Sequence, residues 1–385
     1  MLNFRLVKLL AIGLLVFVFM IPAHPLLAQT PKVEQIANSL DLSDLNQFLQ
    51  TLDQDTQKFL PSLNPKTWGF IGPEWDYVKV GRGIVNYLLR ELVFNSKLLG
   101  ELLLLAMALA ILQNLQHAFE SDTVGQLAFG ICFLVIMGIV IHSFQVTFKI
   151  AQAALSEMVN FMYAITPLIF SLIAAGGGVT TATIVHPLLI SSVGLVSGTV
   201  SNIIFPLIMV AGLLGMVNYL AEGFQVMKLA HIFKSAAIGM IGLVMALFIG
   251  FITIQGFAAS VADSMALRTA KYVSNTFLPV VGGALSDTME MAASCSMVLK
   301  SGLGIYGLGL IVLITVFPLA KILSLAAIYH LTAAIIQPLG NNRLADALQT
   351  VGGTFLNLFG AVAVVGLMFF ISISILVGIS GMGIR

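Results

Sequence analysis

Charged and hydroxyl side chains gather in one part of an otherwise apolar sequence, residues 257–300. Asp287, Glu290 and Ser294 follow one another at spacings of three and four, which places them on one face of a helix. The stretch before them, 257–275, is amphipathic and carries its polar side chains on a single stripe. That stripe consists of Ser260, Asp263, Ser264, Arg268, Lys271 and Asn275.

Two interpretations fit these charges. Charged groups are costly inside a membrane unless they are paired, so they mark a pathway or an internal ion pair. We therefore expect the acids Asp263 and Asp287 to face a base inside the protein. The candidate set for a pathway and its ion pairs is Asp263, Arg268, Lys271, Asp287, Glu290, Ser294 and Lys300. The alternative is an amphipathic helix at the membrane surface whose charges are solvated.

Two apolar stretches, 161–186 and 277–300, contain residues that interrupt helices. Backbone that is broken at membrane depth is tolerated only when it is buried in protein or lines a wet cavity. We therefore expect discontinuous helices at both places. The residues that predict them are Pro167, Gly176, Gly177 and Gly178 in the first stretch, and Pro279, Gly282 and Gly283 in the second.

The two interrupted stretches belong to a predicted internal repeat, 160–256 and 273–378. Pro167 and Pro279 are related by an offset of 112, and the pairs Phe205-Pro206 and Phe317-Pro318 have the same offset. Lys228-Leu229-Ala230-His231 is echoed by Arg343-Leu344-Ala345-Asp346 at an offset of 115. Chance alignment of prolines is the alternative to duplication, and the pattern leaves open whether the repeats are parallel or inverted. Transport folds often place their pathway between two such repeats.

The amino-acid composition indicates what class of protein carries these residues. Of the 385 residues, 58% are hydrophobic and 9% are charged, and the mean hydropathy is +1.02. Apolar runs of about 20 residues, long enough to cross a bilayer, recur along the chain. The sequence therefore predicts an all-α, polytopic membrane protein with about 8–10 membrane segments, in contact with the lipid bilayer.

Several classes of function are excluded. A net charge of +1 argues against a nucleic-acid partner. The six histidines form no ligand-spaced cluster and the two cysteines support no metal site, so we expect no metal and no cofactor. No Walker A, His-Glu-x-x-His or Gly-x-Ser-x-Gly motif is present, so an enzyme is not expected.

The N-terminal stretch, 1–28, has the pattern of a secretory signal. Arg5 and Lys8 precede the apolar run Leu9–Ile21, and cleavage is expected after Ala28. An uncleaved signal anchor is the alternative, and both place residues 29–97 outside the cytoplasm. The predicted organisation is a signal peptide (1–28), a small helical extracytoplasmic segment (29–97) and a polytopic membrane domain (98–385).

The polar region and its surroundings resemble the stage III sporulation protein AE family of endospore-forming bacteria. The residues that carry the resemblance are Ala262-Asp263-Ser264, Arg268, Ala270-Lys271, Leu278–Asp287, Cys295-Ser296, Leu299-Lys300, Gly304 and Gly307. Supporting features are the secretory signal, Gly176-Gly177-Gly178, Phe317-Pro318, and Gln337-Pro338 followed by Arg343.

The resemblance implies a multispanning component of a secretion-like channel complex in the mother-cell membrane around the forespore. The complex supports late forespore development. Implied partners are other stage III sporulation membrane proteins, including ring-forming subunits and a secretion-type ATPase, in a homo- or hetero-oligomer. No enzymatic site is implied. An autonomous secondary transporter built from two repeats is the alternative function.

Overall fold

The computed structural model describes residues 40–61, 75–119, 122–219, 226–277, 282–339 and 342–379. The predicted signal peptide and its cleavage site at Ala28 lie outside these residues. Within them every regular element is a helix, which confirms the all-α class. The elements are α3 (Ser43–Thr51), α4 (Gln54–Gln57), α6 (Tyr77–Phe94), α7 (Ser96–Phe119), α8 (Asp122–Ala175), α9 (Val179–Thr199), the π-helix η1 (Val200–Ile204), α10 (Phe205–Val217), α11 (Met227–Phe277), α12 (Gly282–Ile336), the 3₁₀-helix η2 (Gln337–Leu339) and α13 (Asn342–Ile379).

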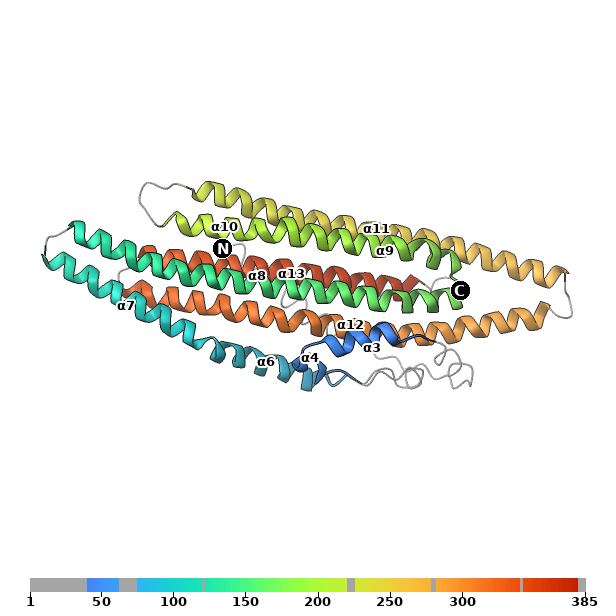
Figure 1. Cartoon of the computed structure of the whole chain (residues 1–385). Helices are drawn as coiled ribbons and strands as arrows, with labels where there is room; N and C mark the ends of the chain where they lie inside the picture. The colour runs from blue at the N-terminus through green and yellow to red at the C-terminus, as the bar shows by residue number, and fades with distance from the viewer. Residues whose placement is uncertain are drawn as a thin grey trace.

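The long helices pack side by side into an elongated bundle (Figure 1). α8, α11 and α12 have 54, 51 and 55 residues, so each is about 77–83 Å long at 1.5 Å per residue. These three helices are therefore much longer than the roughly 30 Å hydrocarbon layer. We call the end where Gly176–Gly178 join α8 to α9 the glycine end. α8, α11 and α13 run toward the glycine end, and α9, α10 and α12 run away from it (Figure 1).

Six helical segments among the described residues are long and apolar enough to span a membrane. They are Val78–Leu109, Phe133–Ala175, Val179–Val217, Met227–Thr269, Ala293–Ile336 and Asn342–Gly378. The multispanning class is thus confirmed, with six candidate spans in place of the predicted 8–10. The first begins at Val78, inside the predicted extracytoplasmic segment 29–97.

Prolines explain the lower number of spans. In the sequence, Pro206 and Pro318 look like boundaries between separate spans, but a proline inside a membrane helix bends it without ending it. Pro318 lies inside α12. At Pro206 the ring would clash with the carbonyl of Asn202 in a regular α-helix. The chain relieves this clash with a π-helical turn at Val200–Ile204 and continues directly into α10.

The predicted helix break in 161–186 is correct at the glycines and wrong at Pro167. α8 runs through Pro167 and ends at Ala175. Gly177 has φ +93°, its N–H donates to Ala174 (3.0 Å), and the Gly178 N–H donates to Ile173 (2.9 Å). This is a Schellman helix end, which needs a glycine in the left-handed conformation.

In the second stretch, α12 begins at Gly282 and continues without a break through Gly283 and Lys300 to Ile336. Pro279 lies outside the described residues. α11 ends at Phe277, so the chain passes from one helix to the next within the predicted stretch 277–300, and α12 itself is unbroken from Gly282 onward.

The N-terminal helices lie along the flank of α8 and α12. Leu45 is fully buried, and the ring of Phe48 packs against that of Phe161 with centroids 5.6 Å apart. Phe317 stacks on Phe59 at 5.9 Å and meets the edge of Tyr87 at 4.8 Å. Residues 40–61 and α6 are thus held on the long helices by aromatic contacts.

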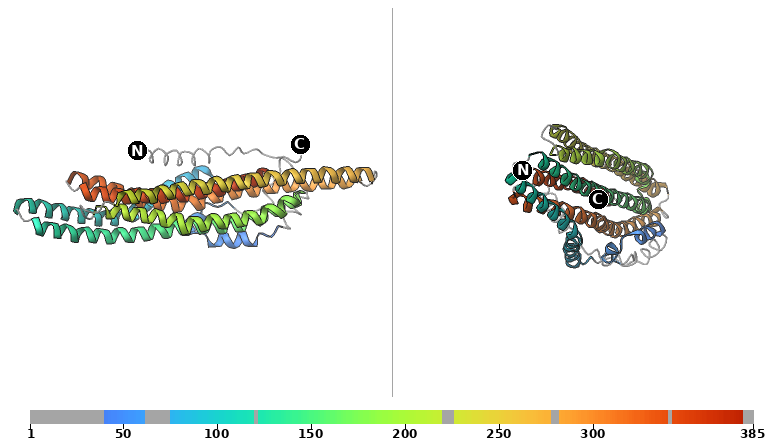
Figure 2. Two further views of the ribbon diagram at one scale, coloured as in Figure 1. Left: turned by 90° about the horizontal axis from the view of Figure 1, so that it is seen from above. Right: turned by 60° about the vertical axis from the view of Figure 1, so that its left-hand side comes forward.

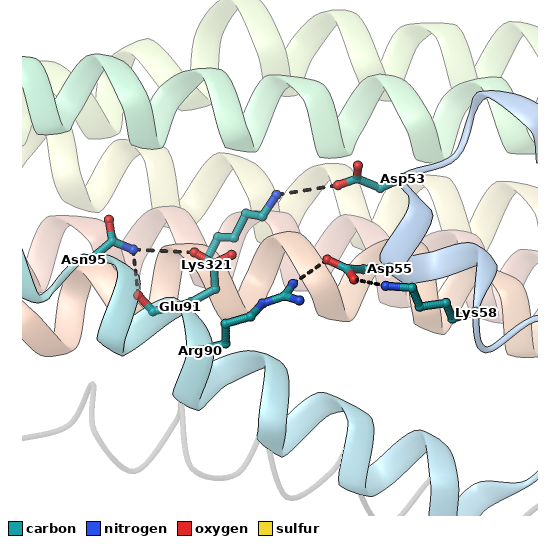
Figure 3. Close-up of polar contacts among 7 residues, drawn as sticks. All are labelled: Asp53, Asp55, Lys58, Arg90, Glu91, Asn95 and Lys321. Carbon is teal, nitrogen blue, oxygen red and sulfur yellow. Dashed lines mark hydrogen bonds and ion pairs between the residues drawn. The ribbon is translucent and has the colours of Figure 1, made fainter.

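Ion pairs also connect the N-terminal segment to α6 and α12 (Figure 3). Asp53 on the loop before α4 lies 3.7 Å from the ammonium of Lys321 on α12. Asp55 pairs with Arg90 of α6 and, at 3.0 Å, with Lys58. Hydrogen bonds from Arg90 and then from Lys58 lower the pKa of the Asp55 carboxyl below its usual value. Because the folded state lowers this pKa, the pair stabilises the folded state at neutral pH, and the effect disappears as acid protonates Asp55.

We predict that the contact between α4 and α6 weakens as the pH falls below about 4, the usual pKa of an aspartate. Asp55→Asn should loosen α4 at pH 7 and abolish the pH dependence, with a loss of less than about 1 kcal/mol because the pair is partly exposed. Amide hydrogen exchange of α4 in the detergent-solubilised protein measures this. Asp44→Asn, an exposed acid on α3, is the matched control and should leave the exchange unchanged. Equal pH dependence in Asp55→Asn and the parent protein would contradict the prediction.

Candidate functional site

Asp263 lies at the centre of the site that the structure builds at the glycine end. Its side chain comes from α11 and is 6% exposed. Its two carboxylate oxygens accept hydrogen bonds from the backbone N–H groups of Thr180 (2.8 Å) and Thr181 (2.9 Å). These N–H groups belong to the first turn of α9, where unpaired donors and the helix dipole favour a negative charge.

The chain needs this long-range cap because α9 has none of its own. The N-cap residue of α9 is Gly178, which has no side chain that could accept a hydrogen bond. A serine or aspartate at this position would normally bind the first N–H groups. Asp263, 83 residues further along the chain than Thr180, replaces it. The carboxylate and the helix start therefore satisfy each other in the bundle interior.

The partners of Asp263 that the structure describes are therefore backbone N–H groups, and the pairing of this acid with a basic side chain stays a prediction. Arg268 lies one turn further along α11 and is exposed. The side chain of Lys271 lies outside the described residues. Buried carboxylates need either a cation or several hydrogen-bond donors, and Asp263 has the donors.

The glycines allow α11 to approach the turn closely. An added Cβ at Gly177 would lie 2.9 Å from Cδ2 of Leu267, in addition to the strain of its positive φ. At Gly178 an added Cβ would lie 2.6 Å from Cγ2 of Ile173 and 3.4 Å from Oδ2 of Asp263. Side chains here would push Asp263 away from the start of α9.

Lys300 is the buried cation of the site, with a side chain that is 1% exposed. Its ammonium has no hydrogen-bond partner among the described residues. Ser296, one turn earlier on α12, lies against Gly176 at the end of α8. Gly304, one turn later, lies against Val377 near the end of α13. Lys300 is thus located between the C-terminal ends of two helices, where the helix dipoles favour a positive charge.

Only part of the remaining predicted pathway set is described. Ser294 is exposed, and the side chains of Asp287 and Glu290 lie outside the described residues. The last turns of α11 and the first turns of α12 extend beyond the glycine end as a projecting pair (Figures 1 and 2). Tyr272 on this pair is 73% exposed. The described part of the predicted polar stripe therefore divides into a buried part, Ser260 and Asp263, and an exposed projecting part.

The sequence analysis missed Thr180, Thr181 and Ser296. The first two take part through backbone N–H groups, which every residue except proline has, so side-chain chemistry gives no signal for them. The available signal is indirect: a helix that follows three glycines has no local cap. In the described residues, no group of three or more histidine, cysteine or acidic side chains is placed to hold a metal ion.

Similarity to known proteins extends over nearly all of the helices described above. The sequence profile of the family described as stage III sporulation protein AE matches residues 72–380. The chain belongs to this family. The stage III sporulation protein AE of Bacillus subtilis (strain 168) is 36% identical over 296 residues, which cover 77% of this chain and 74% of that protein. No solved structure matches. The family match includes the glycine turn, Asp263, Lys300 and all six candidate spans, so the resemblance inferred from the sequence is confirmed.

In this member of the stage III sporulation protein AE family, Asp263→Ala should destabilise the bundle by about 1–3 kcal/mol, because two buried N–H groups lose a charged acceptor. Asp263→Asn should cost less, since its amide oxygen still accepts one hydrogen bond. The measurements are the thermal midpoint in detergent and hydrogen exchange at Thr180 and Thr181.

Ser264→Ala is the matched control, because that hydroxyl bonds only to Ser260 of its own helix among the interactions described. It should melt like the parent protein. A thermal midpoint for Asp263→Ala within error of the parent value would refute the capping role.

Proposed function

We propose that the chain is a multispanning component of a secretion-like channel complex between mother cell and forespore, needed for late forespore development. Membership of the stage III sporulation protein AE family over residues 72–380 is the observation that carries this proposal. The matched residues include every candidate span, so the membrane architecture and the family relationship concern the same part of the chain. The chain acts in this proposal as a structural and conducting subunit and not as an enzyme.

The proposed partners are other stage III sporulation membrane proteins, including ring-forming subunits and a secretion-type ATPase. The proposed location is the mother-cell membrane around the forespore. Two features support a subunit that works in an assembly. The three longest helices, α8, α11 and α12, exceed the thickness of the hydrocarbon layer by more than about twofold. The projecting ends of α11 and α12 also reach beyond the rest of the bundle (Figure 2).

The proposed orientation follows from the secretory signal. If residues 29–97 leave the cytoplasm, six spans return the C-terminus to the same side. α7 then enters the cytoplasm, and the glycine end lies outside. The projecting ends of α11 and α12 accordingly face the space between the two membranes, where partner subunits are accessible.

The predicted repeats, 160–256 and 273–378, remain a proposal. In support, α9–α10 and α12 run in the same direction, and α11 and α13 each return after them (Figure 1). If the two segments arose by duplication, the two repeats would have the same orientation in the membrane, so the repeats would be parallel. The alternative of an autonomous secondary transporter rests on the repeat and on discontinuous helices, and of these predicted helix breaks the one at Pro167 is absent, because α8 runs unbroken through it. Solute transport by the purified chain in liposomes would nonetheless favour the transporter over the channel subunit.

In a sporulating strain that lacks its own copy, we expect the parent chain to restore heat-resistant spores. The double variant Asp287→Leu with Glu290→Leu should give far fewer spores, because both acids lie on the part of α12 that we assign to the pathway or to partner contacts. Membrane levels of the protein, measured by immunoblot, should stay unchanged. Met291→Leu, exposed on the same helix and not among the candidate pathway residues, is the control. Normal spore yield from the double variant would remove these acids from the proposed mechanism.

The orientation is tested by cysteine labelling in a chain whose natural Cys132 and Cys295 are replaced. Tyr272→Cys, exposed on the projecting end of α11, should react with a membrane-impermeant maleimide added to intact cells. Lys228→Cys, exposed at the start of α11, should react only after the cells are permeabilised. Labelling of Lys228→Cys but not Tyr272→Cys in intact cells would reverse the proposed orientation.

A further inference from the structure

A cavity of about 310 Å³ lies far from the glycine end, between α10, α11 and α13. Apolar and small residues form part of its wall, including Ala211, Gly215 and Ala230. Polar side chains from two helices also line it, among them His231 and Lys234. Its volume is at the lower end of the range for small-molecule sites, which suits a ligand of about the size of a lipid head group.

The charges in this cavity are unpaired within the part of the chain that the structure describes. Lys234 on α11 is half-buried, and no carboxylate among the described residues lies within ion-pair distance of its ammonium. Asp346 on α13 lines the same cavity and likewise has no ion-pair partner among those residues. The cavity thus offers one cation and one anion that do not neutralise each other. A ligand with one charge of each sign would complement both.

The cavity lies at the depth of lipid head groups. Between Lys234 and Asp263, the α11 segment 235–262 contains no charged side chain and no histidine. At 1.5 Å per residue this segment is about 42 Å long, close to the thickness of a bilayer with its head-group regions. Asp263 and Lys234 therefore lie near the two surfaces of the membrane.

Lipid has direct access to this part of α11. Ile238, Leu243 and Leu247, on the membrane side of the cavity-lining Lys234, are 48%, 61% and 65% exposed. Apolar side chains that are exposed on a membrane helix face acyl chains. A molecule in the cavity can thus have its polar part between α11 and α13 and its apolar part against α11.

We propose that the cavity between α10, α11 and α13 binds a phosphate group that carries a primary ammonium, as in the head group of phosphatidylethanolamine. Lys234 pairs with the phosphate, and Asp346 accepts hydrogen bonds from the ammonium. The amide side chains of Gln349 and Asn357, which also line the cavity, supply further hydrogen-bonding groups. The proposal does not depend on the sporulation role, because it concerns only the membrane protein and its lipid.

The two echoed sequence motifs meet at this cavity. His231 closes the first motif, at the start of α11, and Asp346 closes the second, at the start of α13. Each places a polar side chain in the first turns of a long helix. The site is thus assembled from equivalent positions of the two predicted repeats.

Gly353 provides a direct test, since it lines the cavity and an added Cβ there would meet nothing within 4 Å. Gly353→Leu should fill the cavity without disturbing neighbouring atoms. Gly360→Leu is the matched control, because Gly360 lies two turns further along α13, also has open space, and is not among the residues that line the cavity.

The full chain is purified in mild detergent and incubated with phosphatidylethanolamine or phosphatidylcholine, and bound lipid is counted by native mass spectrometry. We expect preferential binding of phosphatidylethanolamine, because the trimethylated ammonium of phosphatidylcholine cannot donate to Asp346. Gly353→Leu should weaken binding by about tenfold or more, and Gly360→Leu should leave it unchanged. Equal binding to the parent protein and Gly353→Leu would overturn the proposal.

Two charge variants test the proposed contacts with the ammonium and with the phosphate of the ligand one at a time. Asp346→Asn should remove the preference for phosphatidylethanolamine over phosphatidylcholine, and Lys234→Gln should weaken binding of both lipids. An undiminished preference in Asp346→Asn would contradict the assignment. Free phosphoethanolamine is tested separately by its effect on the thermal midpoint. A shift as large as that given by the lipid would identify a soluble zwitterion as the occupant and refute the lipid.

Discussion

The need to satisfy backbone polar groups inside an apolar bundle governs much of this structure. An unpaired N–H or C=O costs several kcal/mol in hydrocarbon, so a helix cannot simply end there. At the glycine end, the last carbonyls of α8 are satisfied by the N–H groups of Gly177 and Gly178. The first N–H groups of α9 are satisfied by Asp263. One compact turn therefore reverses the chain without leaving these backbone groups unpaired.

The same constraint explains how charges are distributed. Asp263 and Lys300 are both buried, and both are located at helix ends whose dipoles have the opposite sign. Further along α12, Lys321 is paired with Asp53 from the N-terminal segment. α12 therefore carries one buried charge whose ammonium has no hydrogen-bond partner among the described residues, and another that is paired with a side chain from a different part of the chain. The long helix connects the glycine end to the flank where α3, α4 and α6 lie.

The sequence predicts the class of fold well and the local geometry less well. Long apolar runs and scarce charge predict a helical membrane protein, because no soluble core needs so much apolar surface. The number of spans is overestimated because Pro206 and Pro318 look like helix ends, whereas neighbouring helices and a π-turn accommodate them. Asp263 is identified as a site residue, but its partners are not, because a backbone N–H has no signature in the sequence. The turn at Gly177 is visible, since three glycines in an apolar run have few other uses.

The distance in sequence between Asp263 and its partners has a consequence for biosynthesis. Translation produces α8, the glycine turn and α9 well before residue 263, so Thr180 and Thr181 enter the membrane environment without their acceptor. Until α11 arrives, their N–H groups must be satisfied by water or by the insertion machinery. The start of α9 is therefore completed late, and the earlier helices remain adjustable until α11 is in place. The order of synthesis therefore sets the order of assembly at this point. The start of α9 is completed only when the carboxylate of Asp263, 83 residues after Thr180, has been synthesised and packed against it.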